Sequence, residues 1–216
     1  TKTIPLDDSF SIRPDDYDID CGGIILHNPN APTGIGLPLS DIKHLVATHP
    51  DQVVAIDEAY VDFGGETAIP LVRDHDNLIV VRTFSKSRSL AGMRVGYAIA
   101  QSPLIEALER LKDSFNSYPL DRLAQVAAIA SIEDEDWFIT HRDRLVANRE
   151  WLSQQLEELG FSILPSQANF IFARKPDWEG KALAAKLRER AILVRHFNQP
   201  RIADFLRISI GTEEQC

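Results

Sequence analysis

The sequence predicts an α/β protein in which a mostly parallel sheet comes first and a smaller α+β unit follows. Two observations carry this prediction. In the first hundred residues, short runs rich in Val and Ile recur, and the connection between the first two has helical periodicity. In the second half, a long helical segment is followed by further strand-like runs and another helix. Alternating strands and helices are typical of a parallel sheet, whereas grouped elements indicate α+β packing.

The predicted strands of the first unit lie at GIILHN, VVAID, LIVVRT and VGYAIA. Each run is short and nearly continuous in apolar residues, which predicts strands that are buried on both faces of the sheet. Between the first two runs, LSDIKHLVATHP predicts a helix, with Ser40 as its cap. Ile42, Leu45 and Val46 would share the face of this helix that packs on the sheet.

The second unit is predicted to start within a long helix. Apolar residues recur at helical spacing from Asp136 to Leu159, and Gly160 is placed to end the helix. The segments FSILPSQANFIFAR, AILVRHF and FLRISIGT then alternate with a helix near Gly180 to Arg190. We place the boundary near residue 145, so that residues 1–145 belong to a large domain and residues 146–216 to a small one.

Composition narrows the classes of partner. The formal net charge of -9 lacks the basic footprint that nucleic acid or an anionic membrane surface selects, so we expect small-molecule partners. The two cysteines, Cys21 and Cys216, are too few for a disulfide framework or a zinc site, which favours a reducing, cytoplasmic location and no metal. No apolar stretch has the length of a membrane span, and the first residues do not read as a signal peptide.

Polar side chains follow three of the predicted strands at the point where each strand ends. They are His27, Asn28 and Asn30 after the first run, Asp57, Glu58 and Tyr60 after the second, and Thr83, Ser85 and Lys86 after the third. Ligands of open α/β sheets bind outside the carboxyl ends of the strands, so we expect these groups to converge on one pocket. Lys86 is then a candidate covalent amine, and the alternative is a solvated loop lysine.

One cofactor, pyridoxal phosphate, fits a lysine, an acid and a phosphate-binding turn that occur together. Its aldehyde takes a lysine, its pyridine nitrogen takes a carboxylate, and its phosphate takes hydroxyls and an arginine. Lys86, Asp57, the hydroxyls of Thr83 and Ser85, and Arg94 offer these groups. Arg94 follows a small-residue turn, and a guanidinium binds phosphate in a bidentate manner.

The segments NPNAPTG, DEAYVDF, TFSKSRSLAGMRVGYA and LRISIGT resemble those of the histidinol-phosphate aminotransferases, which belong to the fold-type I pyridoxal-phosphate aminotransferases. The resemblance implies a pyridoxal-phosphate-binding large domain and a small C-terminal domain. It also implies transamination of L-histidinol phosphate with 2-oxoglutarate, giving imidazole-acetol phosphate and glutamate, in histidine biosynthesis. The resemblance further implies that the complete enzyme is a homodimer.

The resemblance also implies roles for individual residues. Lys86 would bind the cofactor covalently and shuttle a proton, Asp57 would pair with the pyridine nitrogen, and Tyr60 would contact the phenolic oxygen. The phosphate would be bound by Thr83, Ser85 and Arg94, with Asn30 as a further cofactor contact. On the substrate side, the implied residues are Arg207, Arg195 and Asn169.

Several alternatives stay open. The chain has Ala31 where many aminotransferases have a cofactor-binding asparagine, and the family's upstream cofactor turn and final helix are not recognisable, so we expect part of an enzyme. Another enzyme of the same fold, such as an aromatic aminotransferase or a threonine-phosphate decarboxylase, is one alternative, and a non-catalytic fragment is another.

Glu58 could be a second acid, but neighbouring strand residues point to opposite faces, which favours a structural role. Asn169 could equally satisfy local backbone.

Overall fold

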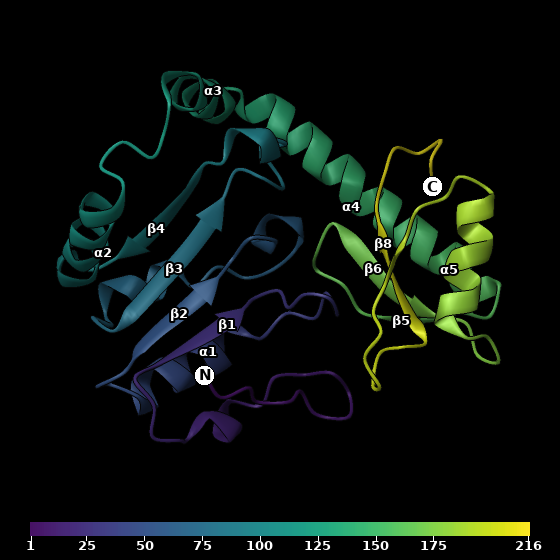
Figure 1. The fold of residues 1–216 in the computed structure, drawn as a ribbon, viewed down its shortest axis with the longest axis horizontal. Coiled ribbons are helices and arrows are strands. Elements are labelled where there is room, and N and C mark those ends of the chain that lie inside the picture. Colours follow the sequence, from purple (N-terminus) through teal and green to yellow (C-terminus); the bar gives the residue numbers. More distant parts are fainter.

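The computed structural model describes residues 1–216 and contains two four-stranded sheets that lie side by side (Figure 1). The first sheet has the order β1-β2-β3-β4, and the second has the order β5-β6-β8-β7. The strands of the first sheet are β1 (Gly23–His27), β2 (Val53–Asp57), β3 (Leu78–Thr83) and β4 (Gly96–Ala100). Those of the second are β5 (Ser162–Leu164), β6 (Phe170–Arg174), β7 (Arg195–His196) and β8 (Phe205–Ser209).

The pairing of the strands confirms the predicted fold class. In the first sheet, β1, β2 and β3 run parallel, and β4 pairs with β3 in the antiparallel sense. All pairs of the second sheet are antiparallel. The molecule therefore joins a mostly parallel α/β unit to an antiparallel α+β unit.

Five α-helices connect and cover the sheets. They are α1 (Leu39–Thr48), α2 (Ser102–Phe115), α3 (Arg122–Glu133), α4 (Glu135–Glu158) and α5 (Gly180–Glu189). The three helices expected near residues 39–50, 136–159 and 180–190 are confirmed within one or two residues. Residue 145, where we placed the domain boundary, lies inside α4, and the boundary itself stays a prediction. No helix is both long and apolar enough to cross a membrane.

The predicted cap of α1 is wrong. The carbonyl of Pro38 accepts from the amides of Asp41 and Ile42, so Pro38 is the N-cap and Ser40 already lies within the helix. The Ser40 hydroxyl contacts the Asp41 carboxylate at 3.3 Å instead of a backbone amide. The helix starts before the serine because the proline carbonyl is already oriented toward the first turn.

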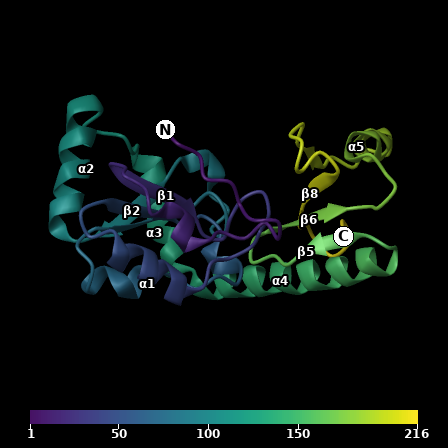
Figure 2. The same ribbon diagram turned by 90° about the horizontal axis from the view of Figure 1, so that it is seen from below.

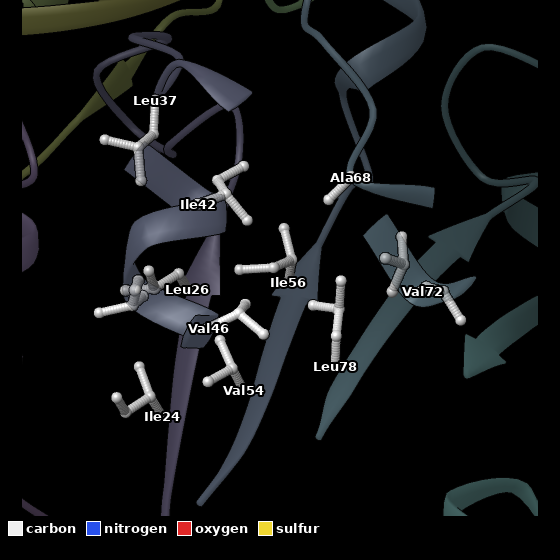
Figure 3. Packing of buried hydrophobic residues seen from close by; sticks show 12 residues of the cluster. Ile24, Leu26, Leu37, Ile42, Val46, Val54, Ile56, Ala68, Val72 and Leu78 are labelled. Carbon is white, nitrogen blue, oxygen red and sulfur yellow. The ribbon is translucent and has the colours of Figure 1, made fainter. Parts of the chain in front are cut away.

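The main core lies between α1 and one face of the first sheet (Figure 3). Ile42, Leu45 and Val46 are fully buried there, as their spacing predicts. They pack in one cluster with alternate residues of the strands, among them Val54 and Ile56. Burial of side chains of this size contributes about 1.5–3 kcal/mol each, so this cluster holds the sheet and α1 together.

The opposite face of the first sheet is open, which corrects the prediction of strands buried on both faces. Ile25 is 77% exposed, and Val53 and Val81 are also exposed. The register places Ile25 beside Ala55, and Asp57 beside Val81, on this same face. The open face therefore carries apolar side chains next to the carboxylate of Asp57.

The segment before β1 is attached to α1 through a buried histidine. His49, which follows α1, contacts the carbonyl of Leu45 through Nδ1 at 2.8 Å and the carbonyl of Tyr17 through Nε2 at 3.0 Å. Tyr17 ends the short 3-10 helix η1 (Pro14–Tyr17) and packs against the main core. Burial raises the pKa of the Tyr17 phenol above its ordinary value of 10.0, and the charge of Asp16 raises it further.

This raised pKa predicts a loss of stability in alkali. Below pH 10 the phenol is neutral in the folded and unfolded chains, so its contribution is fully present; above that, the unfolded chain ionises first and the contribution is lost as the pH rises through the folded pKa. We expect the free energy of unfolding to fall less steeply above pH 10 in Tyr17→Phe than in the wild type. Urea unfolding at pH 8 and at pH 11 measures this difference. Equal slopes for the two proteins would contradict it.

The two sheets are joined by α4 and by two loops. Figure 2 shows α4 running beneath the second sheet, and the helix packs on β5 and β6 and on the 3-10 helix η2 (Val61–Phe63) next to the first sheet. From α4, buried Arg149 donates to the carbonyl of Phe63 at 2.8 Å and to that of Ala168 at 3.0 Å. The amide of Gln167 donates to the carbonyl of Gly34 at 2.8 Å. Gly34 has φ +84, and a Cβ there would lie 2.5 Å from the Ser166 hydroxyl, so this close approach requires glycine.

Candidate active site

Asp57 lies at the carboxyl end of β2, on the open face of the first sheet. One oxygen of its carboxylate accepts from the amide of Ala59 at 2.9 Å, which fixes the side chain at the strand end. The other lies 3.8 Å from Nε2 of His27, the residue paired with Asp57 in the register of β1 and β2. Both side chains are partly exposed, so the carboxylate remains accessible to a ligand.

Lys86 lies in the turn after β3. The amide of Ser89 donates to the carbonyl of Lys86 at 3.1 Å, and the amide of Leu90 donates to that of Phe84 at 2.9 Å, so the turn is closed by its own backbone. The side chain is half-buried, and its Nζ lies 5.3 Å from the centre of the Tyr60 ring. The Lys86 ammonium forms no salt bridge with a carboxylate.

Aromatic rings connect Lys86 to the second sheet. The Tyr60 ring meets the edge of Phe170, the first residue of β6, with centroids 5.1 Å apart. On Phe170 lies the guanidinium of Arg207, from the neighbouring strand β8, at 5.0 Å. The predicted lysine and the predicted substrate arginine are therefore separated by two aromatic rings that pack edge to face.

Arg207 and Arg195 face each other in the register of β7 and β8. Both guanidinium groups lie near the ring of Phe197, at 5.9 and 5.6 Å. The Nε of Arg207 is buried and has no hydrogen-bond partner. A buried donor without an acceptor is costly, so this pair of arginines is suited to bind an anionic group.

The three predicted phosphate-binding residues differ in their present contacts. The Thr83 hydroxyl donates to the carbonyl of Val95 at 3.3 Å and accepts from the amide of Ser85 at 3.1 Å, so it organises the turn before Lys86. Ser85 is half-buried in that turn. Arg94 has a left-handed backbone conformation, with φ 55, and donates to the carbonyl of Ala91 at 2.9 Å from an exposed position. Phosphate binding by these residues stays a prediction.

Two asparagines hold the loop after β1. The Asn30 backbone closes the loop by bonds to Ile35 and Gly34. Asn28 is 1% exposed, and its amide group exchanges two hydrogen bonds with the backbone of Leu37. Sequence reasoning expected Asn28 to converge on the pocket with the other strand-end groups, which is wrong: its side chain is buried and fixes this loop. On the second sheet, the backbone carbonyl of Asn169 accepts from the amide of Ile210 at 3.0 Å.

Glu58 has the structural role that strand alternation favours. Its side chain is fully buried and accepts from the amide of Ala68 at 2.5 Å and from the Thr67 hydroxyl at 2.8 Å. It also forms a salt bridge with Arg82 at 2.9 Å. Asp57, by contrast, points to the open face, so the two neighbouring acids are separated by the sheet.

Comparison with known proteins decides the family. The family described as "Aminotransferase class I and II" matches this chain over residues 2–216, which is almost its entire length. The chain belongs to the aminotransferase class I and II family. The structure of the histidinol-phosphate aminotransferase from Sinorhizobium meliloti in complex with pyridoxal-5'-phosphate has the same fold as this aminotransferase chain, with a TM-score of 0.88 at 23% identity, over 99% of this chain and 60% of that one.

Two sequence relatives of this aminotransferase chain are much more similar. It is 65% identical to "Histidinol-phosphate aminotransferase 2" of Rhizobium meliloti strain 1021, over 99% of this chain and 61% of the relative. It is 63% identical to "Histidinol-phosphate aminotransferase" of Aromatoleum aromaticum, over 100% of this chain and 62% of the relative. The chain thus spans about three fifths of the length of these relatives.

Proposed function

We propose that this protein catalyses the pyridoxal-phosphate-dependent transamination of L-histidinol phosphate with 2-oxoglutarate, in histidine biosynthesis. Two relatives above 60% identity are named histidinol-phosphate aminotransferases, which supports the substrate. The observation that carries the chemistry is the half-buried Lys86, whose ammonium lies without a carboxylate partner over Tyr60, at the same edge of the first sheet as Asp57. This arrangement favours a reactive amine over a solvated loop lysine.

The residues at this edge fit pyridoxal phosphate by the chemistry of their donors and acceptors. When bound, the cofactor supplies an electron sink for the bonding electrons of the substrate carbon. Lys86 Nζ would hold the cofactor covalently and, once released by the substrate, move a proton as general base and acid. The accessible Asp57 carboxylate would keep the pyridine nitrogen protonated, and the Tyr60 hydroxyl would orient the ring. Thr83, Ser85, Arg94 and Asn30 would bind the cofactor's oxygens.

Substrate binding is assigned to the second sheet. We infer that Arg207 and Arg195 bind the anionic group of the substrate, because the orphaned Nε of Arg207 lies beside the ring of Phe170 that contacts Tyr60. Asn169 directly precedes Phe170 and would orient the same substrate. Arginines at this position satisfy a doubly charged phosphate and a carboxylate alike, as the two half-reactions require.

Location and assembly are part of the same proposal. We infer a cytoplasmic location from the two free cysteines, and a homodimer from the resemblance of the sequence motifs to those of the dimeric aminotransferases. The rival activities, an aromatic aminotransferase or a threonine-phosphate decarboxylase, would use the same cofactor chemistry, and the substrate-side residues decide between them. A panel of substrates separates these activities, because kcat/KM should be highest for histidinol phosphate.

Labelling of Lys86 tests the proposal. The holoenzyme is expected to have a visible absorbance band from lysine-bound cofactor, and borohydride should bleach this band and fix the cofactor on Lys86, because this amine is the one beside Tyr60. Peptide mapping by mass spectrometry locates the label. Lys43, on the exposed side of α1, is the internal control and should remain unmodified. A label on another lysine, with Lys86 unmodified, would overturn the assignment.

A further inference from the structure

The residue after Lys86 forms a buried contact that the proposed chemistry does not use. Ser87 is 8% exposed, and its hydroxyl donates to the carboxylate of Asp62 at 2.5 Å. Asp62 lies 25 residues earlier, within η2. Because the partners belong to different loops, this hydrogen bond fixes the position of one loop relative to the other.

Asp62 is itself held by a partly buried arginine. Its other oxygen lies 3.5 Å from Nη1 of Arg82, and Nε and Nη2 of Arg82 bind Glu58 at 3.0 and 2.9 Å. Burial alone would lower the pKa of Arg82, but the charges of Glu58 and Asp62 and the hydrogen bond to Glu58 raise it above the ordinary value. The arginine therefore stays charged and keeps the Asp62 carboxylate in place.

The same short helix carries both Asp62 and Tyr60. Tyr60 is the N-cap of η2, two residues before Asp62. On the other loop, Ser87 directly follows Lys86. The hydrogen bond between Ser87 and Asp62 thus lies beside the contact between Lys86 and Tyr60, and it connects the same two backbone segments.

We propose that Asp62 and Ser87 are positioning residues, which set the distance and direction of the Lys86 ammonium relative to Tyr60. This inference rests on the proposed function, since it concerns the lysine assigned there. Closure of the turn by its own backbone bonds defines its shape, whereas the bond from Ser87 to Asp62 determines where the turn lies above η2. Small displacements of a reacting group are costly in rate, so this contact has a catalytic consequence.

The test removes the hydroxyl in the holoenzyme. Ser87→Ala should keep the fold, because Arg88 holds the other side of the turn by donating to the carbonyl of Ser131 at 2.7 Å and to Glu135 at 2.9 Å. We expect kcat to fall about tenfold, as for a lost hydrogen bond to a charged group, with KM changed less than about twofold. The visible band should also titrate at a shifted pH, since the position of Lys86 relative to Tyr60 changes. Ser87→Thr, which retains the hydroxyl, should restore both values.

A readout without cofactor comes from amide hydrogen exchange in the apoprotein. The amides of Ser85 to Leu90 should exchange faster in Ser87→Ala and in Asp62→Ala, because the turn is less firmly held above η2. The matched control is Ser40→Ala, which removes another serine hydroxyl facing an aspartate, on α1 and in a separate part of the fold. It should leave kcat, the titration and the exchange unchanged.

The outcomes separate this inference from the proposed function. If borohydride labels Lys86 in the wild type while Ser87→Ala retains the wild-type kcat, titration and exchange, the positioning role is refuted and the proposed function stands. If Lys86 is not labelled in the wild type, the proposed function is refuted first. Equal changes in Ser87→Ala and Ser40→Ala would also refute the positioning role, because they would indicate a general effect on the fold.

Discussion

Asp57→Asn is expected to lower kcat for histidinol-phosphate transamination on the order of 100- to 1000-fold, as for the loss of one preorganised charge at a reacting centre. The fold should survive, because the amide oxygen of asparagine can still accept from Ala59 as the carboxylate does. The cofactor should still be fixed on Lys86 by borohydride. What is lost is the negative charge that, under the proposed function, would keep the pyridine nitrogen protonated. Steady-state kinetics of the holoenzyme, together with circular dichroism, measure both parts.

Asp41→Asn provides the control for Asp57→Asn. Asp41 is an aspartate in the first turn of α1, where its carboxylate contacts only Ser40 in a hydrogen bond between side chains. Its replacement should leave kcat within about twofold, as is usual for a surface substitution. Near-normal turnover in Asp57→Asn would show that the carboxylate does not act on the cofactor.

Glu58→Gln should have the largest effect on stability, lowering the free energy of unfolding by about 3 kcal/mol. Of the two carboxylate oxygens, one accepts from Ala68 and the other from Thr67 and Arg82. An amide group can replace only one of these acceptors, so either orientation directs an NH₂ toward a donor. It also leaves the partly buried Arg82 with only the more distant Asp62, at 3.5 Å. Urea unfolding at pH 7 measures the change.

Glu133→Gln is the matched control for this measurement. Glu133 is exposed at the end of α3, and its replacement should change the free energy of unfolding by less than about 0.5 kcal/mol. If Glu58→Gln were as stable as Glu133→Gln, the salt bridge with Arg82 would contribute nothing and the buried network would be an incidental contact.

The sequence predicts the elements because their signals are local. Continuous Val and Ile runs predict the strands of the first sheet, and the spacing of Ile42, Leu45 and Val46 predicts the buried face of α1. The positions of Lys86, Asp57 and Tyr60 at strand ends predict that they share an edge, because parallel strands end on the same side. The cap of α1 was predicted wrongly because the Pro38 carbonyl competes with Ser40, and propensity alone does not resolve that competition.

Contacts between distant segments could not be predicted. Phe170 lies between Tyr60 and Arg207 only because the second sheet lies beside the first, and no periodicity encodes that placement. The hydrogen bond of Ser87 to Asp62 likewise joins two loops 25 residues apart. The open face of the first sheet escaped prediction for a different reason. An apolar run indicates that a strand can be buried on both faces, but it does not indicate which segment covers the second face.

Arg149 has a consequence for motion. Its guanidinium holds one carbonyl from each side of the junction, Phe63 beside the first sheet and Ala168 before β6, and both acceptors are backbone atoms. A rotation of the two sheets that pivots at this side chain keeps both hydrogen bonds, whereas a sliding motion breaks at least one of them. These two contacts therefore resist sliding of one sheet along the other more than rotation about the junction.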